Sequence, residues 1–183
     1  MFSDKRIETV LEFWFETLSP KQWWSKDAEL DHLIQDRFGE LHRQAAQCEL
    51  YPWRDSAPGR LAEIIVLDQF SRNIFRNQPQ AFAQDCQALV LAQEAVFCGD
   101  AAKLSPQQKA ILYLPYMHSE SRAIHEIAVR LYGELGLAEN LDFELRHRAI
   151  VDRFGRYPHR NQILGRSSTP EEMEFLRQPG TSF

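Results

Sequence analysis

The sequence is poor in cysteine and has no long apolar stretch. Its three cysteines, Cys48, Cys86 and Cys98, form no CxxC pair and cannot all be paired, which favours a reducing compartment over a disulfide framework. The longest nearly apolar run, AILYLPYM at residues 110–117, is far shorter than the ~20 residues that a membrane-spanning helix needs. The N-terminal sequence MFSDKRIETV lacks the apolar segment of a signal peptide. We therefore expect a soluble, cytoplasmic protein with no membrane partner.

Acidic residues outnumber basic ones, 26 to 21, and most of the basic residues are arginine. The formal net charge is -5 and the pI is about 5.7, which argues against a nucleic-acid partner because that role needs a basic face. Of the 21 basic residues only five are lysine, and six arginines fall within residues 145–166 against a single acid, Asp152. The planar fork of an arginine fits a carboxylate or a phosphate. This stretch therefore either binds an anion or pairs with acids on neighbouring helices.

The alternating pattern of a β-strand is missing over any useful length. Apolar residues instead recur every three or four positions, as at Ile7 and Val10, which is typical of helices packed against a core. Residues 58–75 are apolar on more than one face, which predicts a central, buried helix. Thr169 followed by proline and two glutamates is a strong helix start. We predict an all-α protein of about eight antiparallel helices, forming a single domain over residues 1–183.

The predicted central helix carries a group of polar side chains. Asp68, Arg72 and Arg76 are four residues apart and share one helix face, and Asn73 lies beside them. A lone buried carboxylate is costly, so Asp68 must find a partner. Either Asp68 has a purely structural role, paired with Arg72 or capping the N–H groups of another helix, or it orients its basic and amide neighbours around a ligand.

A second group follows Pro115 in the segment YLPYMHSES, residues 113–121. Proline removes a backbone donor and kinks or ends a helix, so His118 and Glu120 are expected at a helix junction. Histidine titrates near neutral pH and can act as an acid, a base or a ligand. The alternative is that Ser119 caps the next helix, Glu120 lies in its first turn and His118 is a packed imidazole.

Motifs for metals and cofactors are missing. No spacing of histidine, cysteine and acidic residues matches a zinc site, and there is no P-loop, GxSxG or GxGxxG. The triplet His118-Ser119-Glu120 is like half of a zinc deaminase signature, but the PCxxC half is lacking. We therefore predict no metal and no cofactor.

A third group lies in the loop FGRYPHRNQILGR, residues 154–166. A proline fixes an extended turn there, so His159, Arg160 and Asn161 are expected to project from a rigid loop, the usual platform for binding residues. The arginines of this loop either hold an anion or bind acids of the protein itself, namely Glu171, Glu172 or Asp68.

Long segments of the chain resemble the DUF924 family of bacterial proteins of unknown function. The segments that carry the resemblance are VLEFWF (10–15), QWWSKD (22–27), LDQFSRNIFR (67–76), YLPYMHSE (113–120), RFGRYPHRNQILGRSSTPEE (153–172) and FLRQPGTSF (175–183). The resemblance covers nearly the whole chain and implies a TPR-like α/α superhelix. It implies no reaction.

Two hypotheses follow. In the first, the three polar groups line one pocket that binds a small anionic molecule, a phosphate or a carboxylate, with or without catalysis. The candidate ligand-binding residues are Asp68, Arg72, Asn73, Arg76, Arg160 and Asn161, and the candidates for proton transfer are His118, His159 and Glu120. In the second, the protein is a scaffold that binds a peptide or protein in a helical groove, and its polar network is structural. The second hypothesis predicts an exposed patch that involves Trp23, Trp24 or Trp53.

Overall fold

The chain folds into helices joined by short loops, as the computed structural model shows for residues 4–181. It is 74% helical, and no strand occurs among the described residues. The all-α prediction is therefore confirmed. The α-helices are α1 (Lys5–Glu12), α2 (Pro20–Trp23), α3 (Ala28–Ala46), α4 (Ala57–Ile64), α5 (Ser71–Ile74), α6 (Asp85–Phe97), α7 (Pro106–Leu112), α8 (Leu114–Met117), α9 (Arg122–Leu135), α10 (Ala138–Phe154) and α11 (Pro170–Leu176). The π-helical segments are η1 (Phe13–Thr17) and η3 (Ile65–Phe70), and the 3₁₀ segments are η2 (Tyr51–Asp55), η4 (Pro79–Phe82), η5 (Asp100–Lys103) and η6 (Pro158–Arg160).

The predicted central helix is present and buried. Segments α4, η3 and α5 follow one another without a break, and every residue of η3 is buried. Leu61 and Phe70 are 0% exposed, because other core side chains pack around this helix. At its start, a Cβ on Gly59 would lie 2.0 Å from the carbonyl oxygen of Trp53, so only glycine lets η2 pack this closely on α4.

The predicted helix boundaries are also found. Thr169 caps α11 in a capping box, and Ser105 does the same for α7. Helix α7 ends at Leu112, and α8 begins with Pro115 in its first turn. The proline therefore interrupts the helix as predicted, because its ring and missing N–H are tolerated only near a helix start.

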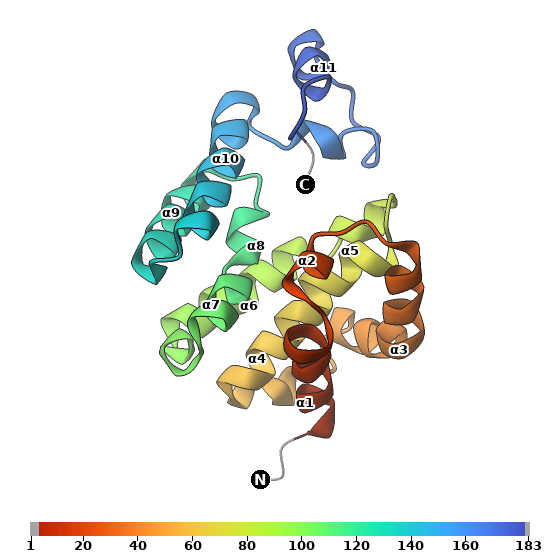
Figure 1. Ribbon diagram of the computed structural model, residues 1–183, viewed down its shortest axis with the longest axis vertical. Helices are drawn as coiled ribbons and strands as arrows, with labels where there is room; N and C mark the ends of the chain where they lie inside the picture. Colours follow the sequence, from red (N-terminus) through yellow and green to blue (C-terminus); the bar gives the residue numbers. More distant parts are fainter. Residues whose placement is uncertain (1–3, 182–183) are drawn as a thin grey trace.

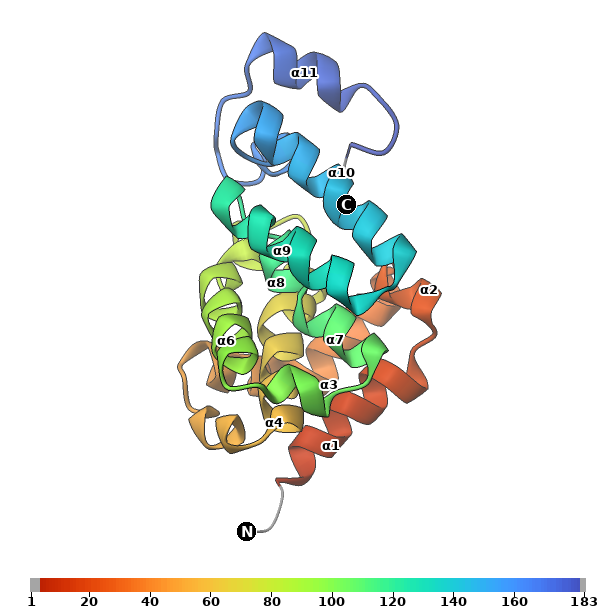
Figure 2. The same cartoon turned by 90° about the vertical axis from the view of Figure 1, so that its left-hand side faces the viewer.

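The elements form a large body and a smaller C-terminal part (Figures 1 and 2). Helices α9 and α10 pack side by side in opposite directions, and α11 lies at the far end of the molecule from α1. We call residues 155–169, which join α10 to α11, the C-terminal loop. Most buried apolar side chains form one core. A second cluster of Ile150, Val151 and Tyr157, with Phe154 and Phe175 against it, holds α10, the C-terminal loop and α11 together.

None of the described helices is long and apolar enough to cross a membrane. The TPR-like arrangement that the family resemblance implies stays a prediction.

Candidate functional site

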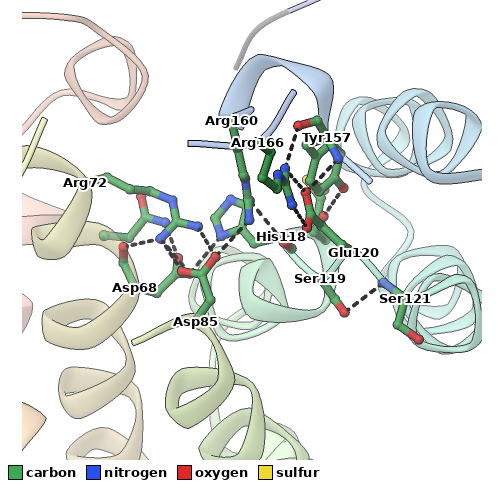
Figure 3. Close-up of polar contacts among 12 residues, drawn as sticks. Asp68, Arg72, Asp85, His118, Ser119, Glu120, Ser121, Tyr157, Arg160 and Arg166 are labelled. Carbon is green, nitrogen blue, oxygen red and sulfur yellow. Dashed lines mark hydrogen bonds and ion pairs between the residues drawn. The ribbon is translucent and has the colours of Figure 1, made fainter. Parts of the chain in front are cut away.

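Five ionisable side chains from four separate parts of the chain meet where the C-terminal loop approaches the body (Figure 3). We call them the charged cluster: Asp68 in η3, Arg72 in α5, Asp85 at the start of α6, His118 after α8 and Arg160 in η6. Four of the five were candidates from the sequence. The fold therefore brings together at least one residue from each of the three polar segments that the sequence analysis identified.

Asp68 is the most deeply buried member of the cluster, at 1% exposed. Its Oδ1 atom lies 2.7 Å from Nδ1 of His118 and 3.2 Å from Nη1 of Arg72, and Gln69 donates to Oδ2. An ionised carboxylate only accepts, so Nδ1 of His118 carries a proton and Nε2 of the neutral ring keeps its lone pair.

The surroundings of this pair shift both of its pKa values downward. Burial by itself raises the pKa of Asp68, but the charges of Arg72 and of a protonated His118, with the hydrogen bonds from His118 and Gln69, outweigh it and hold the pKa well below its usual range. For His118, burial lowers the pKa, the positive charge of Arg72 lowers it further, and Asp68 opposes both. At neutral pH the pair is therefore an aspartate and a neutral imidazole.

Arg160 is fixed by two aromatic rings and two acceptors. The carbon of its guanidinium lies 4.6 Å from the ring centre of Phe82 and 4.8 Å from that of Tyr157. Nη1 donates to Asp85 at 3.1 Å, and Nη2 donates to the carbonyl oxygen of His118 at 3.0 Å. Such a stacked guanidinium is preorganised, because the two rings and the two acceptors hold its planar fork in one orientation.

Asp85 is a cluster member that the sequence did not single out. Its two oxygens accept hydrogen bonds from Nη1 and Nη2 of Arg72 at 3.0 and 3.1 Å. Its Oδ2 atom also accepts a hydrogen bond from Nη1 of Arg160. An acid in the first turn of a helix is ordinary, since the helix dipole favours it. No feature of the local sequence distinguishes Asp85 from other such acids, and only the fold brings it between the two arginines.

A cleft of about 290 Å³ opens beside the cluster. Its walls come from residues 79–89, from the α8–α9 junction and from the C-terminal loop. The lining side chains include the apolar Phe82, Leu89, Pro115 and Leu164, and the polar Asp85, Cys86, His118, Glu120 and Arg160. A mostly apolar cleft with a few convergent polar groups is typical of small-molecule sites.

Arg76 and Asn73 do not join the cluster. Both donate to Asp31 of α3, Asn73 at 2.8 Å and Arg76 through Nε and Nη2. Helix α5 ends at Ile74, so Arg76 lies beyond the helix and no longer shares the face of Asp68. The expectation that Arg76 lies with Arg72 is corrected for this reason.

The remaining candidates take part in neighbouring contacts. Glu120 borders the cleft, but its carboxylate accepts from Nη1 and Nη2 of Arg166 at 2.6 and 2.9 Å and from the backbone N–H of Tyr157. Asn161 is buried and donates to Ser168 and Glu172. Burial lowers the pKa of His159 to about 3. The nine candidates are thus divided among several networks and do not all line one pocket.

The concentration of arginines in residues 145–166 is mostly explained by ion pairs. The pairs are Arg146–Asp142, Arg148–Asp152, Arg153–Glu171, Arg156–Glu172, Arg160–Asp85 and Arg166–Glu120. Each of the six arginines therefore has an acidic partner. Within this stretch, Arg160 is the arginine that borders the cleft.

The tryptophans expected to anchor a protein partner are largely covered. Trp53 is 3% exposed. Trp23 is partly buried, stacks on Trp14 with ring centres 5.7 Å apart and donates to its carbonyl oxygen. Trp24 is 57% exposed. Of the three tryptophans that the scaffold hypothesis requires at an exposed patch, only Trp24 is largely exposed.

The described residues contain no group of three or more histidine, cysteine or acidic side chains placed to hold a metal ion. The fold and the site therefore define an all-helical protein with a charged cluster beside a small cleft.

The chain belongs to the DUF924 family, described as bacterial proteins of unknown function, which matches residues 10–180. It is similar in structure to a protein of unknown function from Agrobacterium tumefaciens. The TM-score is 0.89 and the identity is 39%, over 94% of this chain and 97% of that one. None of the curated proteins matches the chain.

Proposed function

We propose that the cleft binds a small molecule with a carboxylate group and that Nε2 of His118 accepts a proton from another group of that molecule. The observation that carries the proposal is the hydrogen bond from His118 to the buried Asp68 at the wall of the cleft. A histidine oriented by a carboxylate is a common arrangement for a general base, since the acid fixes the ring and stabilises the imidazolium that forms.

The orientation of the His118 ring supports this role. Nδ1 faces Asp68, which is buried, while the ring itself borders the cleft and its side chain is 14% exposed. The edge opposite Nδ1 carries Nε2 with its lone pair. Because the pKa of His118 is lowered, the ring stays neutral at pH 7 and is able to accept a proton there.

The charges around the cleft favour a carboxylate over a dianionic phosphate. Two carboxylates, Asp68 and Asp85, offset the two guanidiniums of Arg72 and Arg160. With a neutral His118, the charged cluster has no net charge. A single negative charge beside the preorganised Arg160 is therefore favoured over two, since each added charge also meets Asp85.

Cys86 offers a direct test, because it is exposed and lines the cleft. The wild-type protein is alkylated with iodoacetamide alone and with each member of a panel of small carboxylates and phosphate monoesters. Mass spectrometry follows Cys86, with the exposed Cys98 as the internal reference. We expect at least one carboxylate to slow the alkylation of Cys86 and to leave Cys98 unchanged.

Two arginine variants complete the test. Arg160→Lys is expected to lose the protection, because an ammonium does not reproduce the stacked fork. Arg76→Lys alters another partly buried arginine, which lies outside the cleft. This variant is expected to keep the protection of Cys86. If no compound protects Cys86 at millimolar concentration, or if Arg160→Lys protects as well as the wild type, the proposal is wrong.

We also propose that the protein is cytoplasmic. All three cysteines are free and exposed thiols, which fits the cytoplasmic location expected from the sequence.

A further inference from the structure

Three consecutive backbone carbonyls around His118 each accept a hydrogen bond from a side chain of another element, α9 or the C-terminal loop. The bonds are Tyr157 Oη to the oxygen of Met117 at 2.5 Å, Arg160 Nη2 to that of His118 at 3.0 Å, and His125 Nε2 to that of Ser119 at 2.9 Å. We call these three bonds the carbonyl clamp. It surrounds the peptide units on both sides of His118.

The carbonyl clamp takes the place of the water or capping group that usually binds the last carbonyls of a helix. Helix α8 ends at Met117, and the last carbonyls of a helix have no partner within it, so they normally bind water or a cap. Here the donors are buried side chains: Tyr157 is 1% and His125 0% exposed. The backbone at His118 is therefore held without relying on solvent.

His125 is a fixed donor because of its own partner. Nδ1 lies 2.7 Å from Oε1 of Glu144, which is also 0% exposed. The carbonyl of Ser119 only accepts, so Nε2 of His125 carries a proton. One further proton then lies between Nδ1 and Glu144, as an imidazolium–carboxylate or an imidazole–carboxylic acid pair. Both forms leave the N–H at Nε2 directed at Ser119.

We infer that Tyr157 and His125 are positioning residues that hold His118 against Asp68 through the carbonyl clamp. The inference rests on the proposed role of His118 as a proton acceptor. In the carbonyl clamp, the hydrogen bonds of Tyr157 and His125 go to the backbone beside His118 and not to its imidazole. Each acts on the backbone on one side of it, while Asp68 acts on the ring.

The test is the titration of the His118 imidazole, followed by ¹H–¹⁵N NMR in Tyr157→Phe. This change removes one hydroxyl and keeps the ring against Arg160. Once the Met117 carbonyl is released, the loop relaxes and the imidazole gains water. We expect its pKa to rise, with a mixture of ring tautomers in place of one.

Tyr132→Phe is the matched control. Tyr132 is 0% exposed and donates to the carbonyl oxygen of Ala110 at 3.0 Å, so loss of its hydroxyl removes a similar hydrogen bond at a carbonyl outside the carbonyl clamp. His118 is expected to titrate as in the wild type. A shift of equal size in both variants would mean that His118 responds to any loss of stability, which overturns the inference.

Two changes at His125 test the same network from its other buried donor, since Nε2 of His125 also lies 3.1 Å from Oη of Tyr157. His125→Leu removes the donor to Ser119 and is expected to shift the titration of His118 as Tyr157→Phe does. His125→Gln keeps an N–H donor and is expected to restore the wild-type titration. An unchanged His118 in Tyr157→Phe, or failure of both Tyr157→Phe and His125→Leu to fold, overturns the inference. Protection of Cys86 by a carboxylate would stand in either case, so the two proposals fail separately.

Discussion

The substitution Asp68→Asn tests the charged cluster most sharply, because it removes a charge and keeps the shape of the side chain. Asp68 is 1% exposed and contacts both His118 and Arg72. Removing one partner of a buried ion pair typically costs about 3–5 kcal/mol. Arg72 keeps its two bonds to Asp85, so we expect the low end, about 3 kcal/mol.

Urea unfolding measures this loss. With an m value of about 2 kcal/mol/M, a loss of about 3 kcal/mol lowers the midpoint by about 1.5 M. The second measurement is the NMR titration of His118. Asp68 supports the protonated imidazole in the wild type, so its neutralisation is expected to lower the pKa of His118 further below 6.5.

Asp31→Asn is the control for this prediction. Asp31 accepts from Arg76 and Asn73 in a similar part-buried network outside the charged cluster. Its neutralisation is expected to lower the urea midpoint but to leave the titration of His118 unchanged. If Asp68→Asn leaves the pKa of His118 at its wild-type value, the hydrogen bond does not govern the imidazole and the reasoning is refuted.

Three further predictions concern stability. Arg160→Lys loses the stacked fork, worth about 1–2 kcal/mol, and is expected to lower Tm by about 4 °C in calorimetry; an unchanged Tm contradicts the stacking argument. Burial lowers the pKa of His147 to about 3, whereas the unfolded value is about 6.5. The unfolded state therefore binds the proton first as pH falls, and His147 alone makes the free energy of unfolding about 2 kcal/mol smaller at pH 5 than at pH 7. Urea curves at both pH values check this, and an equally steep loss in His147→Gln would count against it. Glu63 is 0% exposed and paired with Arg54 at 2.6 Å, so Glu63→Gln is expected to cost about 3 kcal/mol; a change in urea midpoint within error would refute this.

The fold was predictable because it depends on local patterns. The apolar residues of the central helix required burial on all sides, and the structure places them there. The capping boxes and the break at Pro115 are properties of a few neighbouring residues. Such signals are readable because propensity, capping and burial agree.

The charged cluster was predictable only within one helix. The spacing of Asp68 and Arg72 predicts their contact, and the ion pair is present at 3.2 Å. The same spacing failed for Arg76 because the helix ends at Ile74. The bond between Asp68 and His118 joins residues 50 positions apart. Their contact depends on how α6, α8 and the C-terminal loop pack together, and the sequence carries no local signal for this packing.

The arginines near the C-terminus show how a composition signal is ambiguous. Arg156 and Arg166 pair with Glu172 and Glu120 and hold the C-terminal loop in place. Arg160 uses the same chemistry on Asp85 and also borders the cleft. Sequence alone does not separate these roles, because in both an arginine meets a carboxylate.

The most direct test of the proposed site is the NMR titration of His118 in the wild-type protein, with and without the carboxylate that protects Cys86. We predict a free-state pKa below 6.5, a proton on Nδ1 in the neutral ring, and a rise in pKa when the carboxylate binds, because a nearby negative charge favours the imidazolium. A ring that carries its proton on Nε2, titrates at or above 6.5 and does not respond to any carboxylate would contradict the account.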